Sequence, residues 1–534
     1  MRGPTFRRAL ALLLGGAMLN ISWPGSAAET KAVRPPALAG TWYPESPSIL
    51  LATAHGLMRQ AVPAARPSGK PVALLVPHAG WVYSGAAAAS AFRLLSHGAF
   101  RRVVVLAPSH YGGFSGYALD DVERYRTPVG EIPLSKEGLA TLKQDGLARV
   151  VPGVTGPEHA VEIELPFLQA ALGSFELVPV LVGRTDAASE RAFAERLARL
   201  DDGGTLFVIS SDFTHYGPRF DYAPFGPTSG ATKKIREMDA TAIGLIARGD
   251  APGFRAFLHE KGATICGRNG IGTLLELLPR IAPKGGATLL AHWASGEMPE
   301  VRDDSSVDYV AMAFTREAGG TGAPLTAPPV PRAVPVDAPR LPEELGRALV
   351  RVARGTLELD LAGRSETLSA ALRSLENRTE ASRLQAVFVT LKLTDPREIA
   401  RVGELRGCIG QVVPTHPLDL AVVTSALDAA VHDPRFPPVQ ARELKALSVE
   451  VTVLSPIRPV GSWKEIRIGE HGIVLEKGGR RALFLPQVAV EQKWTLEETL
   501  EHLSAKAGLG RGEWRSGASF SVFTGQVFHE DGVH

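Results

Sequence analysis

The feature that most constrains the fold is a phrase that occurs twice near the N-terminus, in which an apolar run ends in proline and a histidine follows. Residues 74–80 read LLVPHAG and residues 104–110 read VVLAPSH. Between them, residues 85–95 are rich in alanine and predict a helix. Because a strand, a helix and a second strand form a crossover unit, the two strands are expected to be parallel and adjacent in one sheet.

The residues that follow parallel strands lie along one edge of the sheet, where open α/β folds place their functional sites. His78 and His110 are therefore expected at this edge. A single histidine after a strand is usually a hydrogen-bonding loop residue, but two at one edge favour a metal site. Three other histidines follow no such phrase and are expected on the surface: His55, His97 and His259.

Strand-like and helical runs alternate from residue 34 to residue 316, which is typical of a three-layer α/β domain. The predicted strands are 72–76, 103–106, 177–181, 206–209, 288–292 and 307–314. The predicted helices are 86–95, 160–172, 188–200, 231–248 and 271–278.

The composition changes abruptly at residues 317–342, where prolines and glycines leave no apolar stripe and predict a semi-rigid linker. The remaining residues, 343–534, mix helical and alternating segments and predict an α+β domain with an antiparallel sheet. Its expected helices are 343–357 and 418–431, and its expected strands are 386–393, 447–454 and a hairpin of 466–475 with 481–485.

Bulk properties narrow the function classes. At 534 residues the chain is too long for one core and predicts two or more domains. A net charge of +2 gives no reason to expect nucleic acid as a partner. The two cysteines, Cys266 and Cys408, fall in different predicted domains and exclude a disulfide framework.

Residues 1–28 are typical of an export signal. Arginines precede a short apolar run, 9–18, and small residues follow it. The run is too short for a stable membrane span, so we expect an exported, periplasmic protein, delivered by the general secretory route or, because Arg7 and Arg8 are paired, by the twin-arginine route. The alternative is an uncleaved anchor or a misassigned start.

Four further segments supply candidate site residues. Asp212 and His215 follow a predicted strand, as His78 and His110 do, and are therefore expected at the same edge of the sheet. His159 and Glu162, three apart at the start of a predicted helix, would share a face. Cys266 precedes another helix, whose dipole would favour its thiolate. Taken singly, each has a simpler interpretation, as a turn residue, a helix cap or a small buried hydrophobe.

Together these segments resemble the Memo family, also called AmmeMemoRadiSam system protein B. They stand in the family's order over most of residues 34–316: LAGTWYP at 38–44, PHAG at 77–80, PSH at 108–110, EHAVE at 158–162, SSDFTH at 210–215 and TICGR at 264–268. The resemblance implies a fold similar to the catalytic subunit of class III extradiol dioxygenases, which use non-haem iron.

The resemblance also implies roles for individual residues. The metal ligands that it implies are His78, His110 and Cys266. The residues that it implies around the pocket are Asp212 and His215, together with the motif residues His159 and Glu162. The chain departs from the family pattern at Thr214, where a cysteine often stands, and in its export signal.

Two imidazoles and one thiolate suit Fe(II), Cu or Zn and disfavour Mg²⁺ and Ca²⁺. Three protein ligands leave positions open for water, O₂ or a substrate. Iron, which the resemblance favours, or copper would support O₂-dependent, dioxygenase-like chemistry on an unknown small molecule, with Asp212 and His215 available for proton transfer. Two alternatives stay open: zinc-dependent hydrolysis at the same site, and a non-catalytic scaffold for protein interactions. The family name implies a radical-SAM partner, which an exported chain would not readily meet.

The second domain offers one phrase of interest, LRGCIG at 405–410. Arg406 would favour the thiolate of Cys408; the alternative is a buried cysteine in a glycine turn. With DPRF at 433–436 and FLPQVA at 484–489, the segment resembles the AMMECR-type family, AmmeMemoRadiSam system protein A. That family's activity is unsettled, so the resemblance implies a fold and makes Arg406 and Cys408 candidate pocket residues.

Overall fold

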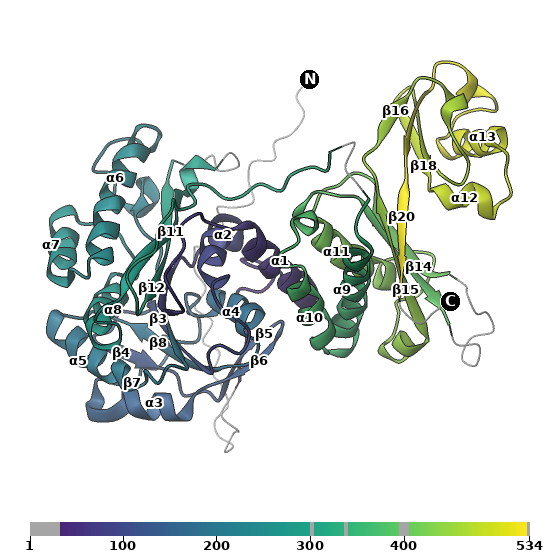
Figure 1. Cartoon of the computed structure of the whole chain (residues 1–534). Coiled ribbons are helices and arrows are strands. Elements are labelled where there is room, and N and C mark those ends of the chain that lie inside the picture. Colours follow the sequence, from purple (N-terminus) through teal and green to yellow (C-terminus); the bar gives the residue numbers. More distant parts are fainter. Residues whose placement is uncertain (1–32, 299–303, 336–339, 395–404, 531–534) are drawn as a thin grey trace, which may run out of the picture.

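The computed structural model of the chain describes residues 33–298, 304–335, 340–394 and 405–530 (Figure 1). The predicted export signal, residues 1–28, lies outside them. A large N-terminal part is joined to a C-terminal part, and helices of both parts meet at the boundary. Within the described residues, no helix is both long enough and apolar enough to cross a membrane.

A mixed sheet, nine-stranded over the described residues, forms the centre of the N-terminal part. Its strand order is β10-β12-β2-β9-β3-β8-β4-β7, and β11 pairs with β12. The strands are β2 (Pro71–Val76), β3 (Arg102–Pro108), β4 (Tyr117–Leu119), β7 (Ala148–Val150), β8 (Glu176–Val182), β9 (Thr205–Ser210), β10 (His215–Tyr216), β11 (Gly286–Ala294) and β12 (Ser306–Thr315). The strands β2, β9, β3 and β8 are parallel and almost wholly buried, which explains their continuous apolar runs.

The two strands that carry the histidine phrases are parallel, as predicted, but the expectation that they are adjacent is wrong. The strand β9 lies between them: Phe207 pairs with Ala73 of β2 on one side and with Val104 of β3 on the other. The segment that follows β9 therefore lies between His78 and His110 at the carboxyl edge of the sheet.

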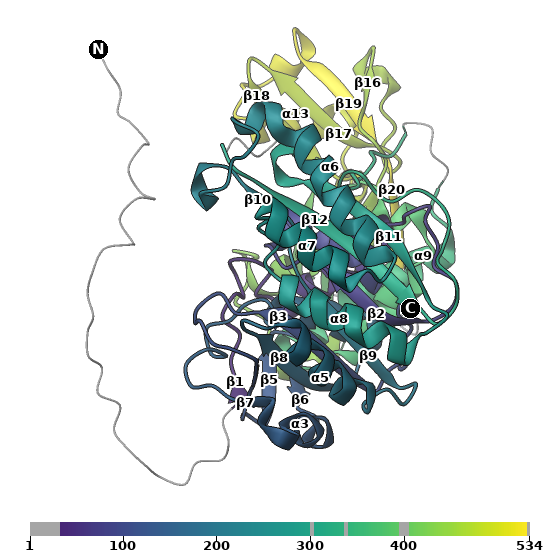
Figure 2. The same cartoon turned by 90° about the vertical axis from the view of Figure 1, so that its left-hand side faces the viewer.

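Helices cover both faces of this sheet, as the three-layer prediction requires. In Figure 2 the helices on one face lie in front of the strands; they are α5 (Ala187–Ala198), α6 (Thr228–Ala247), α7 (Ala251–Lys261) and α8 (Arg268–Ile281). The other face carries α1 (Pro47–Gln60), α2 (Trp81–Phe92) and α4 (Leu165–Leu172). A small sheet of β1 (Val33–Arg34), β5 (Arg124–Thr127) and β6 (Gly130–Pro133), followed by α3 (Lys136–Lys143), lies at the periphery.

The helix predicted over 160–172 begins only at Leu165, after a 3-10 turn, Glu162–Glu164. Pro166 occupies the first turn of α4, where its missing N–H costs no hydrogen bond. A helix starting at residue 160 would place that proline in the interior, where its ring clashes with the carbonyl four residues earlier.

The C-terminal part contains two antiparallel sheets, each four-stranded over the described residues, with orders β14-β13-β15-β20 and β16-β19-β17-β18. The first comprises β13 (Val387–Leu393), β14 (Leu405–Gln411), β15 (Leu447–Leu454) and β20 (Gly525–His529). The second comprises β16 (Arg458–Val460), β17 (Gly472–Lys477), β18 (Arg480–Phe484) and β19 (Ser519–Phe523). The helices are α9 (Glu343–Ala362), α10 (Glu366–Ser374), α11 (Leu418–Val431), α12 (Pro486–Glu491) and α13 (Leu496–Lys506).

The predicted hairpin is present as β17 and β18, joined by Gly478 and Gly479, whose φ angles of 58° and 76° favour glycine. The first strand begins later than expected, at Gly472, because residues 468–470 form a turn in which the His471 N–H donates to the Arg467 carbonyl.

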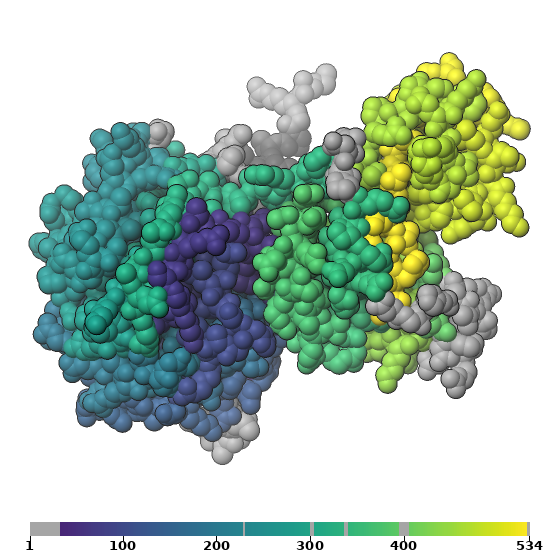
Figure 3. Space-filling model, viewed as in Figure 1, coloured from purple at the N-terminus to yellow at the C-terminus, as the bar shows by residue number. Residues whose placement is uncertain are grey.

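The first section of the linker is bound to the N-terminal part, whereas Arg332 and Ala333 pair with Leu384 of the C-terminal part. The N–H of Arg66 donates to the carbonyl of Thr321, and Leu325 exchanges backbone hydrogen bonds with Leu290 and His292. The helices α1 and α11 meet at the boundary through a buried ion pair of Arg59 with Asp419. In Figure 3 the purple and green surfaces of the two parts are in contact there.

Candidate metal centre

Two imidazoles and one thiol converge at the carboxyl edge of the central sheet. His78 follows β2, His110 follows β3, and Cys266 immediately precedes the Gly267 cap of α8. The Cys266 Sγ lies 3.3 Å from His78 Nε2, and the two imidazole centroids are 5.2 Å apart. One donor atom from each residue lies within 4.8 Å of the other two. The structure thus brings together the three residues that the family resemblance implied as metal ligands.

Each imidazole is oriented by a hydrogen bond from its Nδ1. His78 Nδ1 is 2.8 Å from the Ser210 hydroxyl, whose proton has two acceptors within reach, the Ala160 carbonyl at 2.7 Å and the Glu164 carboxyl at 3.0 Å. Since that proton is used, Ser210 accepts from the His78 Nδ1–H, and the lone pair of His78 is on Nε2. His110 is held at Nδ1 by the Glu158 carboxylate, at 2.9 Å. Such outer partners fix the tautomer and orientation of ligating histidines.

The protonation states suit cation binding. Burial lowers the pKa of His78 well below its usual value, and the nearby His110 lowers it further. Burial alone would raise the pKa of Glu158, but hydrogen bonds and charge from His110 lower it to about 2. The edge therefore combines a neutral His78, which leaves a lone pair for a metal, with an ionised Glu158 that supports the second ligand.

Cys266 does not show the favoured thiolate that its position before α8 predicted. Burial raises its pKa, and the Asp212 carboxylate raises it further. The Asp212 N–H lies 3.2 Å from the sulfur, which offsets this only in part. The dipole of a helix end is worth a fraction of the cost of burying an anion. A metal ion would reverse this balance, since a coordinated thiol is deprotonated.

Asp212 and His215 also reach this edge. Asp212 Oδ1 accepts the backbone N–H of His78 at 2.8 Å, and its Oδ2 lies 4.0 Å from His78 Nε2. Burial raises the pKa of Asp212. His215 begins β10, and its Nδ1–H donates to the carbonyls of Phe213 and Thr264 at 2.9 and 3.0 Å, which leaves its Nε2 as an acceptor.

His159 and Glu162, predicted to share a helix face, point to different places because residues 158–164 form an irregular turn. His159 stacks on the His110 ring, with centroids 4.4 Å apart. Glu162 instead accepts the backbone N–H groups of Ala37 and Leu38 and the Tyr43 hydroxyl, and it pairs with Arg34 at 3.3 Å. Glu162 therefore anchors the segment 34–43 and lies apart from the three ligands.

Four further side chains contribute to the site, and no sequence pattern predicts their roles: Ser210, Glu158, Trp42 and Tyr111. Ser210 and Glu158 belong to the quoted motifs, but nothing in their spacing tells that they face Nδ1 atoms. Trp42 packs on His159 with centroids 4.7 Å apart, and Tyr111, 56% exposed, meets the same ring edge-on at 5.8 Å. These two aromatic rings form a rim beside the imidazoles.

Comparison with known proteins agrees with this arrangement. The model of the Memo-like protein family matches residues 34–313, and the AMMECR1 model matches residues 350–528. The chain belongs to the Memo family. It joins a Memo domain to an AMMECR1 domain, so the fusion suggested by the sequence is confirmed.

Relatives from animals match the Memo domain over most of their own length. The chain is 34% identical to Protein MEMO1 of Danio rerio over 285 residues and 32% identical to Protein MEMO1 of Homo sapiens over 286 residues. Each match covers 52% of this chain and 95% of the relative. Among solved structures, an uncharacterized protein from Pyrococcus horikoshii, PH0010, is 35% identical over 36% of this chain and 94% of its own, with a TM-score of 0.31.

The Memo domain's donor set fits a metal ion. Two imidazole lone pairs and one sulfur are the ligands of soft and borderline cations, and their Nδ1 partners are already in place. His78, His110 and Cys266 would hold such an ion, while Asp212, His159 and His215 surround it.

The AMMECR1 domain contains the second cysteine in a different setting. Cys408 lies in β14, where Asp433 accepts its backbone N–H at 2.9 Å and the Thr390 hydroxyl lies 3.4 Å from its sulfur. It lines a groove of about 1350 Å³. Arg406 does not line this groove, because its guanidinium is bound to Glu443 at 2.9 Å. Of the two predicted pocket residues, the structure places only Cys408 at a pocket.

Proposed function

We propose that the Memo domain is a metal-binding domain whose His₂Cys centre takes Fe(II) or Cu and supports O₂-dependent, dioxygenase-like oxidation of a small molecule. The observation that carries this proposal is the convergence of His78 Nε2, His110 and Cys266 Sγ within 4.8 Å at the sheet edge. A sulfur ligand argues against Mg²⁺ and Ca²⁺. The resemblance of the Memo family to the catalytic subunit of class III extradiol dioxygenases supports iron.

Bound iron or copper would supply redox chemistry, and three protein ligands leave room for O₂ or a substrate. Side chains of the protein would transfer protons and contact the substrate. Asp212 fixes the His78 backbone, and its raised pKa suits it to hold a proton beside the imidazole. His215 Nε2 is a hydrogen-bond acceptor and would take up a second proton. Trp42 and Tyr111 give an apolar rim for a flat or small organic molecule.

Metal content provides the direct test. Protein purified anaerobically, stripped and titrated with Fe(II) should bind about one equivalent with high affinity. The variant Cys266→Ser should lose that affinity, whereas the matched control Cys408→Ser should retain it. If wild type and Cys266→Ser bind iron equally, the proposed centre does not exist.

Zinc hydrolysis is the second candidate, because the same two imidazoles and thiolate also suit Zn²⁺. Protein purified without added metal would then contain zinc, and its activity would not depend on O₂. A physiological effect that survives His78→Ala combined with Cys266→Ser would favour the scaffold interpretation.

We also propose that residues 1–28 direct export to the periplasm, on the evidence of their composition alone. Fractionation and N-terminal sequencing of the mature protein test this: a mature chain that begins near residue 29 supports export. Recovery of the full chain with a cytosolic radical-SAM protein would contradict it and restore that protein as a partner.

A further inference from the structure

A second cluster of potential ligands lies in the Memo domain, outside the His₂Cys centre. It consists of Asp239 from α6, His292 from β11 and Asp308 from β12, and one donor atom of each lies within 4.8 Å of the others. Both carboxylates are completely buried, and His292 is 8% exposed. His292 Nε2 and Asp308 Oδ2 are 3.2 Å apart.

The two buried carboxylates are short of positive charge. Burial raises the pKa of Asp308 to about 7, and burial together with the Asp308 charge raises that of Asp239. The charged groups facing the cluster are Arg236 and Glu297, which pair with each other through Arg236 Nη2, while Arg236 Nε is buried and makes no hydrogen bond among the described residues. Over the described part of the chain, neither aspartate forms an ion pair with lysine or arginine. Buried carboxylates in such surroundings require a proton or a metal ion.

One oxygen of the cluster lacks a partner. Asp308 Oδ1 is buried and accepts no N–H or hydroxyl hydrogen bond among the described residues. The Asp239 and Asp308 carboxyls are within hydrogen-bond reach of each other when one of them is protonated. Asp239 is oriented by the Thr214 hydroxyl, which donates to Oδ1 at 2.6 Å. A buried oxygen without a donor usually marks a water or an ion, and an aspartate held by a hydroxyl is typical of a supported metal ligand.

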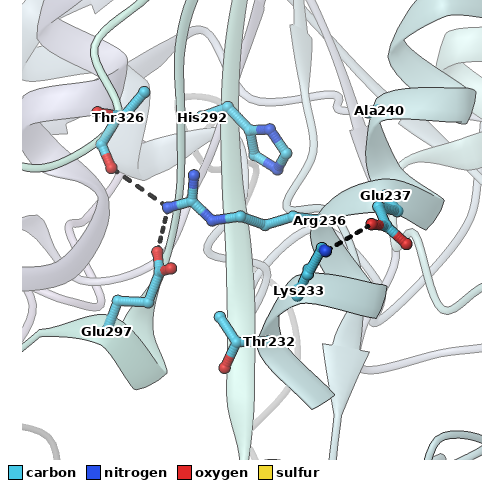
Figure 4. Close-up of a pocket in the computed structure, with 8 residues that line it drawn as sticks. All are labelled: Thr232, Lys233, Arg236, Glu237, Ala240, His292, Glu297 and Thr326. Carbon is cyan, nitrogen blue, oxygen red and sulfur yellow. Dashed lines mark hydrogen bonds and ion pairs between the residues drawn. The ribbon is translucent and has the colours of Figure 1, made fainter. Parts of the chain in front are cut away.

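The geometry also suits an ion. Two donors at about 2.0–2.1 Å from a tetrahedral zinc lie roughly 3.3 Å apart, close to the 3.2 Å between His292 Nε2 and Asp308 Oδ2. His292 lines a surface pocket of about 720 Å³ together with Arg236 and Glu297, which gives an entry path (Figure 4). We propose that Asp239, His292 and Asp308 bind a second divalent cation, Zn²⁺, at this position.

The site would brace the structure next to the first centre. The Asp308 N–H donates to the Thr214 carbonyl at 3.0 Å, and the Phe213 N–H donates to the Asp308 carbonyl at 2.9 Å. Residues 213 and 214 lie between Asp212 and His215. A cation here would tie α6 and β11 to β12, whose Asp308 backbone holds the segment between those two side chains, without itself contacting His78, His110 or Cys266.

The test separates this site from the first one. In a full-length chain that carries His78→Ala and Cys266→Ser, stripped of metal and titrated with Zn²⁺ alone, about one equivalent should still bind, against about two in wild type. Adding His292→Gln should remove the remaining equivalent. The exposed His259 provides a matched control, since His259→Gln should leave zinc binding unchanged.

Folding is followed in each variant by circular dichroism, and Zn²⁺ should raise the melting temperature of the His78→Ala, Cys266→Ser chain but not that of the same chain with His292→Gln. Asp308→Asn keeps the shape of the side chain and should also abolish the shift. If the first-site variant binds no zinc while wild type does, or if His292→Gln keeps its equivalent, the cluster is a proton-sharing network and the proposal is overturned. Failure of the iron titration at the first site would leave this result unaffected.

Discussion

The two cysteines of this chain stand next to glycines in similar-looking phrases, yet their surroundings differ. In the Memo domain, Cys266 lies 3.3 Å from His78 Nε2 at a sheet edge where several imidazoles meet. In the AMMECR1 domain, Cys408 lies on a strand beside a wide groove, near the Thr390 hydroxyl, the Asp433 carboxylate and the Arg435 guanidinium. A cysteine becomes a metal ligand when strand order brings other soft donors to it, whatever its neighbours in sequence.

The largest expected effect tests this contrast directly. Replacing Cys266 with alanine should abolish tight Fe(II) binding, because sulfur is the softest of three ligands. Replacing Cys408 with alanine should leave it unchanged. Elemental analysis after dialysis against a chelator measures the metal content of both variants. Equal metal loss in the two would show that the two cysteines do not differ as ligands.

The next prediction distinguishes Glu162, which stabilises the fold, from the residues that would bind the metal or orient its ligands. Glu162→Ala should lower the free energy of unfolding by about 3–5 kcal/mol, because it leaves the buried Arg34 unpaired. Metal affinity per folded molecule should stay unchanged. Urea unfolding measures the stability, and Fe(II) titration measures the metal affinity. A loss of affinity with unchanged stability would show that Glu162 belongs to the metal site.

Replacing Glu158 should change both properties: stability by less than the Glu162 variant, and metal affinity by less than the Cys266 variant. The pKa of its carboxyl is lowered to about 2 from 4.5, so its ionised form stabilises the fold fully above pH 4.5, and this contribution, on the order of 3 kcal/mol, disappears as pH falls toward 2. Glu158→Gln should remove that acid dependence from unfolding curves. It should also weaken metal binding about 10–100-fold, the usual effect of losing an outer partner.

The smallest effect concerns thiol reactivity in the metal-free protein. Since burial raises the pKa of Cys266, that residue should be alkylated slowly by iodoacetamide near pH 8. Cys408, beside its groove, should react faster, by several-fold. Peptide mass spectrometry over time measures both rates, and a faster Cys266 would show that its thiolate is stabilised in a way that the metal-free geometry does not explain.

Much of the secondary structure of the Memo domain was predictable from local sequence pattern. Apolar runs placed the buried strands within one or two residues, and the proline–histidine phrases placed His78 and His110 at strand ends. The insertion of β9 between them was not predictable from the crossover, because strand order depends on contacts distant in sequence. His55 shows the same limit: expected on the surface, it is completely buried, 3.6 Å from Glu376 of the C-terminal part.

Sequence alone determined the candidate ligands His78, His110 and Cys266 and, within one or two residues, the ends of the predicted Memo-domain strands, since these depend on side-chain chemistry and on the period of apolar residues. Tertiary structure decided which of them meet. Donor atoms of residues 78, 110 and 266 lie within 4.8 Å of one another because β2 and β3 end, and α8 begins, at the same edge. Glu162 turns away because the chain before Pro166 is not yet helical. The Asp239, His292 and Asp308 cluster left no sequence signal, because its members come from a helix and two strands that only packing brings together.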